Sequence, residues 1–266
     1  VIELSLGLFP WAEFRQGKGA AKLHLLLDHD GYMPAFVDLT EGKLNDLKVA
    51  QNLQLPKGSI VALDRCYIDY GMFAKWTDQG VYFVTRLKGN SLLQVIRERR
   101  VPNNSNVLAD CLVKMTGHRV SKKCQAILRV VIIWDERTGR RLTFLTNNLK
   151  LAASTIAEIY RDRWEIELFF KVLKQHLKIK TFVGTSPNAV KVQIWTALIT
   201  LLLIKYLQFR SKSALPLCRL VALLRLNLFT YRDLWDWLDN PLKVPPLQPP
   251  PQLLLPIWTA PAGAGG

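Results

Sequence analysis

The chain has 266 residues, of which 49% are hydrophobic, so it is long enough to bury a full core and too apolar for a disordered protein. Its 36 Lys and Arg against 21 Asp and Glu give a formal net charge of +15, which favours a polyanionic partner. The four cysteines form no CxxC pair and no zinc-like spacing with histidine, and scattered thiols fit a reducing cytosol.

The first third of the chain alternates short apolar runs with turns, which predicts an α/β unit. The first three runs read as neighbouring antiparallel strands, and a later buried strand ends in Asp64. In chain order we expect strands at 1–8, 22–27 and 35–39, a helix at 45–53, a strand at 59–63, a helix at 67–77 and a strand at 81–85.

The middle of the chain, residues 86–148, has β-branched and alternating runs that predict a β-rich insertion. The runs cover 107–115, 126–134 and 142–145, with a turn at 136–139. Trp134 lies at the end of the second run. We interpret it as a buried strand residue, and stacking on an unpaired base is the alternative.

The last part of the chain is predicted to be helical. Thr155 and Glu158 have the spacing of a capping box that opens a long helix, and Ser186 with Pro187 caps the next. Weaker helical patterns follow at 216–226 and 231–238. The predicted segments are a first core part at 1–85, the insertion at 86–148, a helical remainder of the core at 149–240, and a proline-rich, poorly ordered tail at 241–266.

One apolar run is long enough to raise the question of a membrane. Ile194 to Ile204 is the longest such run, and it is too short for a bilayer span and closed by Lys205. We expect a buried helix there and no membrane partner.

The long predicted helix places one acid among cations. At steps of three and four residues, one face would carry Tyr160, Arg163, Glu167, Lys171, Lys174 and Lys178. Cations bind phosphates and a carboxylate binds a metal ion, so this face suits a site that holds both. A solvated face of i,i+4 ion pairs is the alternative that spacing alone leaves open.

The spacing of Tyr160, Arg163, Glu167 and Lys174 resembles the YREK signature of the IS4-type DDE transposases. Asp64 opens a DRCY block that is similar to that family's DRGY block, with Cys66 in the glycine position. The resemblance implies a ribonuclease-H-like core, a mixed sheet flanked by helices. The β-rich insertion precedes the helix with the catalytic Glu.

The same resemblance implies the roles of these residues. Asp64 and Glu167 would be catalytic acids that hold two Mg²⁺ ions, with Mn²⁺ as a substitute. Tyr160, Arg163 and Lys174 would hold phosphates beside the scissile bond. Lys171 and Lys178 share the face without belonging to the signature, and we expect DNA-backbone contacts or solvated lysines there.

The family's first acid has no counterpart in this chain. The resemblance places it a few residues before Val1, while Glu3 lies at a position that the family does not use for metal. Asp28 and Asp30 are expected in a turn. We therefore expect two of three metal-binding acids, weak DNA binding and little or no cleavage.

Three functions follow from these residues. The first is a transposase catalytic domain that cuts the ends of an element in double-stranded DNA and joins them to target DNA. It would work as a homodimer on DNA, in the bacterial cytoplasm at the nucleoid. The alternatives are an inactive DNA-binding remnant and a nuclease on the same fold. Strand-joining assays separate a transposase from a nuclease.

Overall fold

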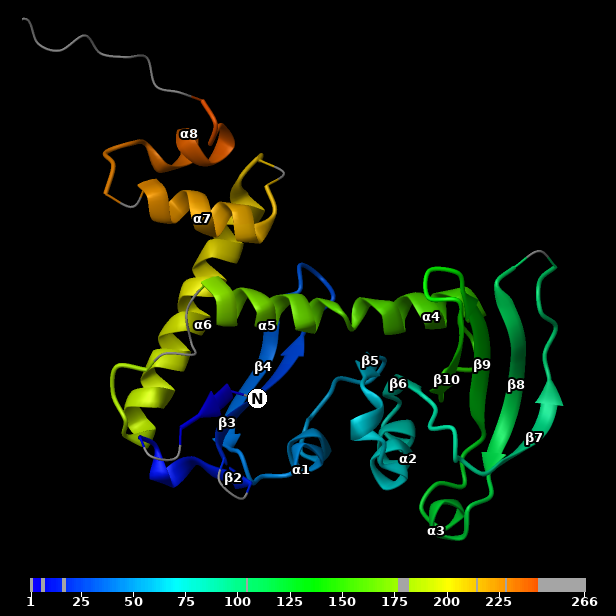
Figure 1. Cartoon of the computed structure of the whole chain (residues 1–266). Coiled ribbons are helices and arrows are strands. Elements are labelled where there is room, and N and C mark those ends of the chain that lie inside the picture. Colours follow the sequence, from blue (N-terminus) through cyan, green and yellow to red (C-terminus); the bar gives the residue numbers. More distant parts are fainter. Residues whose placement is uncertain are drawn as a thin grey trace, which may run out of the picture. The chain divides into compact units, whose positions relative to one another are not determined.

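The computed structural model describes residues 2–5, 8–15, 18–103, 105–176, 182–213, 215–227 and 229–243. It divides the chain into two compact units, Val1–Tyr206 and Leu207–Gly266. The first unit contains two sheets and most of the helices (Figure 1). The predicted tail lies, from residue 244 onward, outside the described residues.

A four-stranded antiparallel sheet is built around the long strand β3, Lys18–Leu27. On one side β3 pairs with β4, Pro34–Glu41, and with the short β2, Glu13–Arg15. On the other side, among the described strands, it pairs with β1 alone, Ile2–Leu4. The predicted antiparallel strands near the start of the chain are thus confirmed.

A mixed six-stranded sheet carries the rest of the β structure. Its strand order is β5, β6, β10, β9, β8, β7, and the only parallel pair in that order is β5 with β6. The predicted insertion strands therefore extend the sheet that begins with β5. The strands are β5 Ile60–Leu63, β6 Tyr82–Arg86, β7 Leu93–Glu98, β8 Val107–Met115, β9 Leu128–Asp135 and β10 Arg140–Thr146.

The sequence pattern did not predict β7. Its residues are mostly exposed, so they lack the apolar alternation that marks a half-buried strand.

Trp134 on β9 is 39% exposed, so the interpretation of a buried tryptophan is wrong.

The helices are short apart from one. They are α1 Asp46–Gln51, α2 Tyr70–Asp78, α3 His118–Ser121, α4 Ala153–Asp162, α5 Glu165–His176, α6 Pro187–Arg210, α7 Leu217–Asn227 and α8 Leu234–Asp239, with 3₁₀ turns at Pro10–Ala12 and Arg65–Tyr67.

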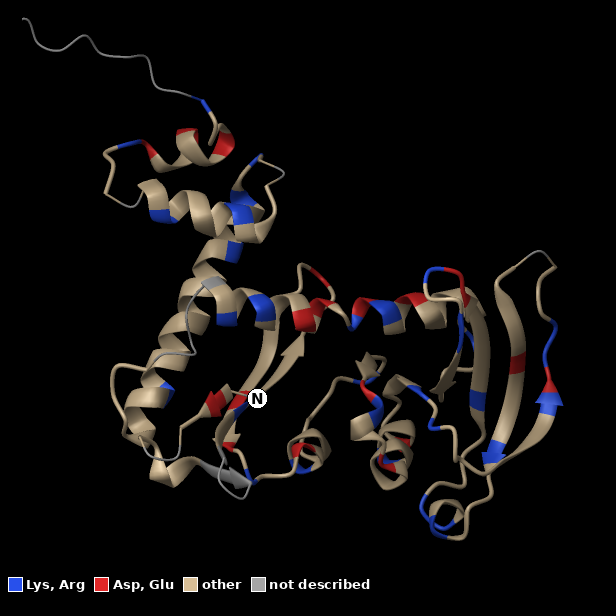
Figure 2. Cartoon of the chain, viewed as in Figure 1, with Lys and Arg blue, Asp and Glu red and all other residues tan. Residues whose placement is uncertain are grey.

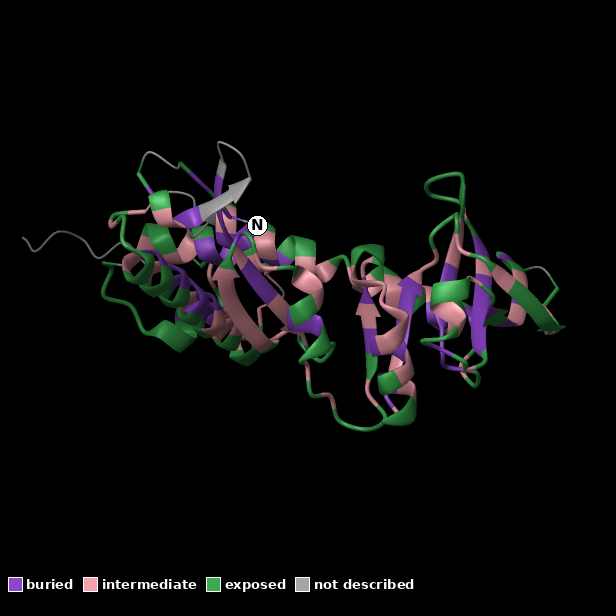
Figure 3. Cartoon of the chain, turned by 90° about the horizontal axis from the view of Figure 1, so that it is seen from below, coloured by how far each residue is buried: buried purple, intermediate pink, exposed green. Residues whose placement is uncertain are grey.

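A large core cluster of the described residues lies between α2 and the mixed sheet. Phe73 of α2 stacks on Phe83 of β6 with ring centroids 3.9 Å apart, and Trp76 packs beside them. Each of these side chains is almost fully buried, which stabilises the fold by roughly 1.5–3 kcal/mol per large apolar residue. Figure 3 shows the buried residues concentrated in the strands. This cluster fixes β5, and with it the strand end that carries Asp64.

Two predictions about helix starts had different outcomes. Ser186 accepts a hydrogen bond from the Ala189 N–H at 3.2 Å, and Pro187 is the first residue of α6, as predicted. The predicted capping box is wrong, because α4 begins at Ala153 without a side-chain cap and Thr155 lies inside the helix.

Helix α6 buries one face rather than its whole surface. Ile194, Leu198 and Leu201 are buried, whereas Ile199 and Leu203 are more than half exposed. By length and composition this helix could cross a membrane, although the core helix of a soluble protein passes the same test, so the evidence is weak.

The second unit contains α7 and α8. Ser211 donates to the carbonyl of Leu238 at 2.9 Å, and Trp237 and Leu238 are buried with Leu220. The helices predicted at 216–226 and 231–238 are both confirmed. Helix α8 begins at Leu234, later than the predicted start at 231.

His24 on β3 provides a pH-dependent test of this fold. The side chain is buried, its Nε2 lies 2.8 Å from Thr40 Oγ1, and burial lowers its pKa from the ordinary 6.5, which Asp46 and Asp38 partly offset. The folded chain favours neutral His24. The contribution of this residue to the free energy of unfolding is therefore fully present above pH 6.5, and it is lost as the pH falls toward the folded pKa. We expect urea denaturation between pH 7 and 5 to show a smaller loss of stability in His24→Gln. The exposed His118→Gln should leave the pH dependence unchanged.

Candidate active site

Asp64 lies where β5 ends and a 3₁₀ turn begins. Its Oδ1 accepts a hydrogen bond from the Cys66 N–H at 3.0 Å, which caps that turn. The backbone of Cys66 does not adopt the positive φ that would favour glycine. Among the described residues, Tyr32 is the one non-glycine residue with a positive φ. Partial burial, followed by the Asp64 carboxylate, raises the pKa of the Cys66 thiol to about 11. The thiol is therefore neutral beside the carboxylate.

The predicted long helix is broken in two at Arg163 and Trp164. The N–H of Trp164 bonds to the carbonyl of Arg161, and that of Glu167 to the carbonyl of Trp164, both three residues back. Such 3₁₀ bonds tighten the chain and interrupt the regular helix between α4 and α5. The expectation of a single continuous helix is therefore wrong, although Arg163 and Glu167 keep their i,i+4 contact.

The break nevertheless brings Arg163 between the two predicted acids. Its Nη2 lies 3.2 Å from Glu167 Oε1, and its Nη1 lies 4.0 Å from Asp64 Oδ2. Both carboxylates are 44% exposed, and the arginine side chain is 16% exposed. Two acids that are far apart in sequence thus lie around one guanidinium group.

Tyr160 packs against the mixed sheet next to this group. Its ring lies 5.2 Å from the ring of Phe144, and the Arg163 guanidinium carbon lies 5.5 Å from the Tyr160 ring centroid. Burial is the main reason that the pKa of Tyr160 is raised; Asp64 raises it further and Arg163 opposes the shift. The phenol is therefore a neutral hydrogen-bond donor at neutral pH.

Within the described part of α5, Lys171 and Lys174 form no ion pair with the two acids. Lys171 is exposed and Lys174 is partly exposed, while Lys178 lies outside the described residues. Along α5 the acidic residues lie in the first turn and the two described lysines follow (Figure 2). The two described lysines are therefore accessible to a polyanion.

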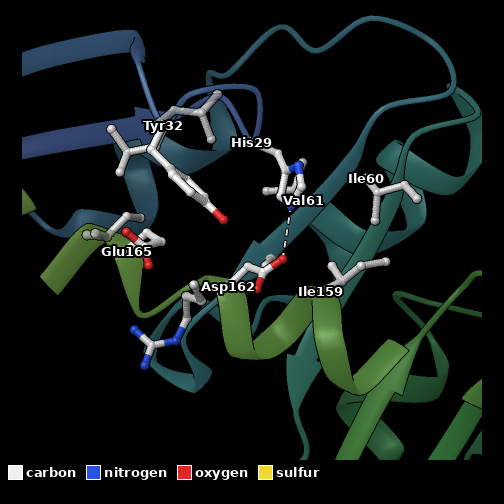
Figure 4. A pocket seen from close by; sticks show the side chains of 12 residues that line it. His29, Tyr32, Ile60, Val61, Ile159, Asp162 and Glu165 are labelled. Atoms are coloured by element: carbon white, nitrogen blue, oxygen red, sulfur yellow. Dashed lines mark hydrogen bonds and ion pairs between the residues drawn. The ribbon is translucent and has the colours of Figure 1, made fainter. Parts of the chain in front are cut away.

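Two adjoining pockets flank Arg163. The larger, about 320 Å³, is lined by β3, β5 and the helix break, and the smaller, about 160 Å³, reaches Asp64. His29 Nε2 and Asp162 Oδ2 lie within hydrogen-bond distance, 3.0 Å, at the larger pocket near Tyr32 (Figure 4). No pattern in the sequence marks these lining residues. His29 and Tyr32 belong to a turn, and Asp162 precedes Arg163 without being part of the YREK signature. Asp28 accepts a bond from the Asp30 N–H within that turn, as expected.

The chemistry of the two acids fits a divalent metal ion. Mg²⁺ is usually bound by one or two carboxylates together with water and substrate phosphates. Asp64 and Glu167 are both partly exposed and close enough to contact one guanidinium, so their chemistry and placement fit such ligands. No group of three metal-binding side chains occurs among the described residues.

Comparison with known proteins identifies the family of this chain. Residues 10–203 match the family described as Transposase DDE domain. The chain belongs to this family. It is 31% identical over 228 residues to the putative transposase y4zB of Sinorhizobium fredii, which covers 84% of this chain and 64% of that protein.

More distant relatives agree. The probable transposase for insertion sequence element IS5377 of Geobacillus stearothermophilus is 29% identical over 77% of this chain and 54% of its own length. Transposase InsG for insertion sequence element IS4 of Escherichia coli is 23% identical over 62% of this chain and 38% of its own length. The predicted IS4-type DDE transposase family and ribonuclease-H-like α/β fold are thus confirmed, and the chain spans about two thirds or less of these relatives.

Proposed function

We propose that this DDE transposase chain forms part of a catalytic centre that cleaves DNA at the ends of a mobile element and joins the ends to target DNA. The placement of Asp64 and Glu167 around Arg163 carries this proposal. The acids would hold Mg²⁺ or Mn²⁺, which supplies activation of the attacking oxygen and stabilisation of the leaving oxygen when bound.

The protein residues would position the DNA backbone. Arg163 is already between the acids, and its N–H groups can donate to a phosphate oxygen. The neutral Tyr160 hydroxyl can donate in the same way, and Lys171 and Lys174 add positive charge along α5. No protein nucleophile is required, because phosphoryl transfer depends on positioning and electrostatics.

Double-stranded DNA would be the substrate, both as element ends and as target, and two copies of the chain would hold two ends. These partners, the location at the bacterial nucleoid, and the roles of Asp64, Glu167, Tyr160, Arg163, Lys171 and Lys174 all belong to this proposal. With two described carboxylates at Arg163, we expect DNA binding to be easier to detect than cleavage.

DNA binding by the α5 lysines can be tested with a labelled random-sequence duplex. We expect Lys171→Ala and Lys174→Ala each to weaken binding several-fold and to lower the salt slope by about 1, because each lysine would neutralise one phosphate. Fluorescence anisotropy over a series of KCl concentrations measures both quantities.

Lys57→Ala provides the matched control, since Lys57 is an exposed lysine in the turn before β5, at the opposite end of that strand from Asp64. Its salt slope should equal that of the unmodified chain. Equal slopes for all three variants would contradict a DNA-binding face on α5.

A further inference from the structure

Helix α6 has an exposed apolar stripe on the side opposite its buried face. The buried face includes Ile194 and Leu201. Lys205, on the same side, donates to the carbonyls of Gly31 and Tyr32, both at 2.9 Å. The stripe, which we call the α6 stripe, consists of five large side chains of the first unit that are each 41–59% exposed: Val192, Trp195, Ile199, Leu203 and Tyr206. At about 100° per residue, these five lie within about 80° of one another around the helix.

The α6 stripe carries no charge. No charged residue occurs between Lys191 and Lys205, on any side of the helix. At the rim of the stripe, the Thr196 hydroxyl donates to the Val192 carbonyl at 2.9 Å, so its donor is already satisfied within the helix. A helix that is apolar on nearly all sides is normally buried on all sides. The stripe therefore fits an apolar protein surface, and it lacks the cations that a polyanion requires.

The spacing of the α6 stripe is symmetric about Ile199. Steps of three, four, four and three residues separate its members, so the order is the same in both directions along the helix. Two copies of α6 that pair antiparallel, with a two-fold axis at Ile199, would place Trp195 of one copy against Leu203 of the other. The same axis would place Val192 against Tyr206. A two-fold interface requires a self-complementary surface of this kind, so the symmetry of the stripe indicates a second copy of this chain as the occupant.

Charge and side-chain size favour antiparallel over parallel pairing of two α6 helices. In a parallel pair, Lys191 would approach its own counterpart and Trp195 would meet Trp195. The helix macrodipoles would also point in the same direction, which is unfavourable. The antiparallel pair opposes the macrodipoles and sets each aromatic ring against a smaller aliphatic side chain.

The exposed area of the α6 stripe is sufficient for a dimer of modest affinity. A fully exposed large side chain presents roughly 150–200 Å², and these five are 41–59% exposed, so pairing would remove about 450 Å² per copy from water. The total of about 900 Å² is close to the roughly 1,000 Å² that a specific interface needs. Half-buried Leu202 beside the stripe would add to this area. We therefore expect a Kd on the order of micromolar.

We propose that two copies of this chain associate through the α6 stripe, as an antiparallel helix pair with its two-fold axis at Ile199. The contact is apolar and forms without DNA or metal. The inference rests on the proposed function only for the use of two copies on two element ends, and the contact itself is argued from α6 alone.

Sedimentation velocity of the full chain without DNA, from about 1 to 100 µM, tests the association. We expect a concentration-dependent dimer. Ile199→Glu should weaken dimerisation by about a hundredfold or more, because two like charges would face each other at the axis. Ile127→Glu is the matched control, since Ile127 precedes β9 and is 43% exposed, and it should leave the dimer unchanged. Circular dichroism checks that each variant is folded.

Disulfide crosslinking tests the position of the two-fold axis. The exposed Cys66 and Cys218 are first replaced by serine. In that background, Ile199→Cys should form a linked dimer on mild oxidation, because this position alone meets its own counterpart in the antiparallel pair. Val192→Cys and Tyr206→Cys, each by itself, should remain unlinked.

Three results would overturn the proposal. The first is a chain that stays monomeric up to about 100 µM, where a Kd in the micromolar range gives mostly dimer. If truncation after Lys243 then produced dimers, residues 244–266 would cover the stripe instead, and if the monomer floated with phosphatidylcholine vesicles, a membrane surface would. The second is a dimer that Ile199→Glu leaves unchanged. The third is equal crosslinking at Val192, Ile199 and Tyr206, which indicates a parallel pair. These measurements contain neither DNA nor metal, so failure here is distinguishable from failure of the proposed function.

Discussion

Replacing Arg129 by alanine is expected to destabilise the first unit by about 3–5 kcal/mol, the usual cost of breaking a buried ion pair by removing one partner. Arg129 on β9 is 1% exposed, and its guanidinium binds Asp110 of β8 through two hydrogen bonds of 2.8 and 2.7 Å. The same group donates to the carbonyls of Asn148 and Leu151, in the segment that leads into α4. The change leaves a buried carboxylate and two carbonyls without this donor.

Urea denaturation followed by circular dichroism measures the loss. The double variant Arg129→Met with Asp110→Leu should recover much of the stability, because no buried charge is left unpaired. The exposed Arg140→Ala is the control and should change the free energy of unfolding by less than about 0.5 kcal/mol. A loss of that small size for Arg129→Ala would mean that the pair does not hold the sheet to the start of α4.

The sequence was sufficient where local pattern and structure coincide. The runs ending at Leu27, Leu39 and Leu63 became strands because apolar residues between turn signals have few other ways to be buried. The acid after Leu63 could be placed at a strand end for the same reason. Its approach to Glu167 could not be inferred from spacing and came from the family resemblance, which the structure supports with Arg163 between the two acids.

The sequence was insufficient where tertiary packing overrides local preference. Nothing in the residues 160–167 marks a helix break, since neither Gly nor Pro occurs there. The break lets Tyr160 pack on Phe144 while Arg163 reaches across to Asp64, and both contacts depend on the mixed sheet. The strand order of the two sheets was equally hidden, because pairing partners are a property of the assembled sheets.

Metal binding should respond in opposite directions to changes at Glu167 and Arg163. Glu167→Gln removes one of the two carboxylates, so we expect Mn²⁺ affinity to fall by about tenfold or more, in line with the loss of a principal ligand charge. Arg163→Gln removes the cation that now lies 3.2 Å from Glu167 and 4.0 Å from Asp64. Because a metal ion would no longer compete with the guanidinium, its affinity should rise, by up to about fivefold for two partly exposed ion pairs.

Isothermal titration of each purified variant with MnCl₂ measures these affinities without requiring catalysis. Glu165→Gln is the matched control, because Glu165 is on the same helix and lines the larger pocket but forms no ion pair with Arg163. Its affinity should match that of the unmodified chain. Equal losses in Glu165→Gln and Glu167→Gln would indicate nonspecific charge attraction, and the two acids around Arg163 would then not be the metal ligands.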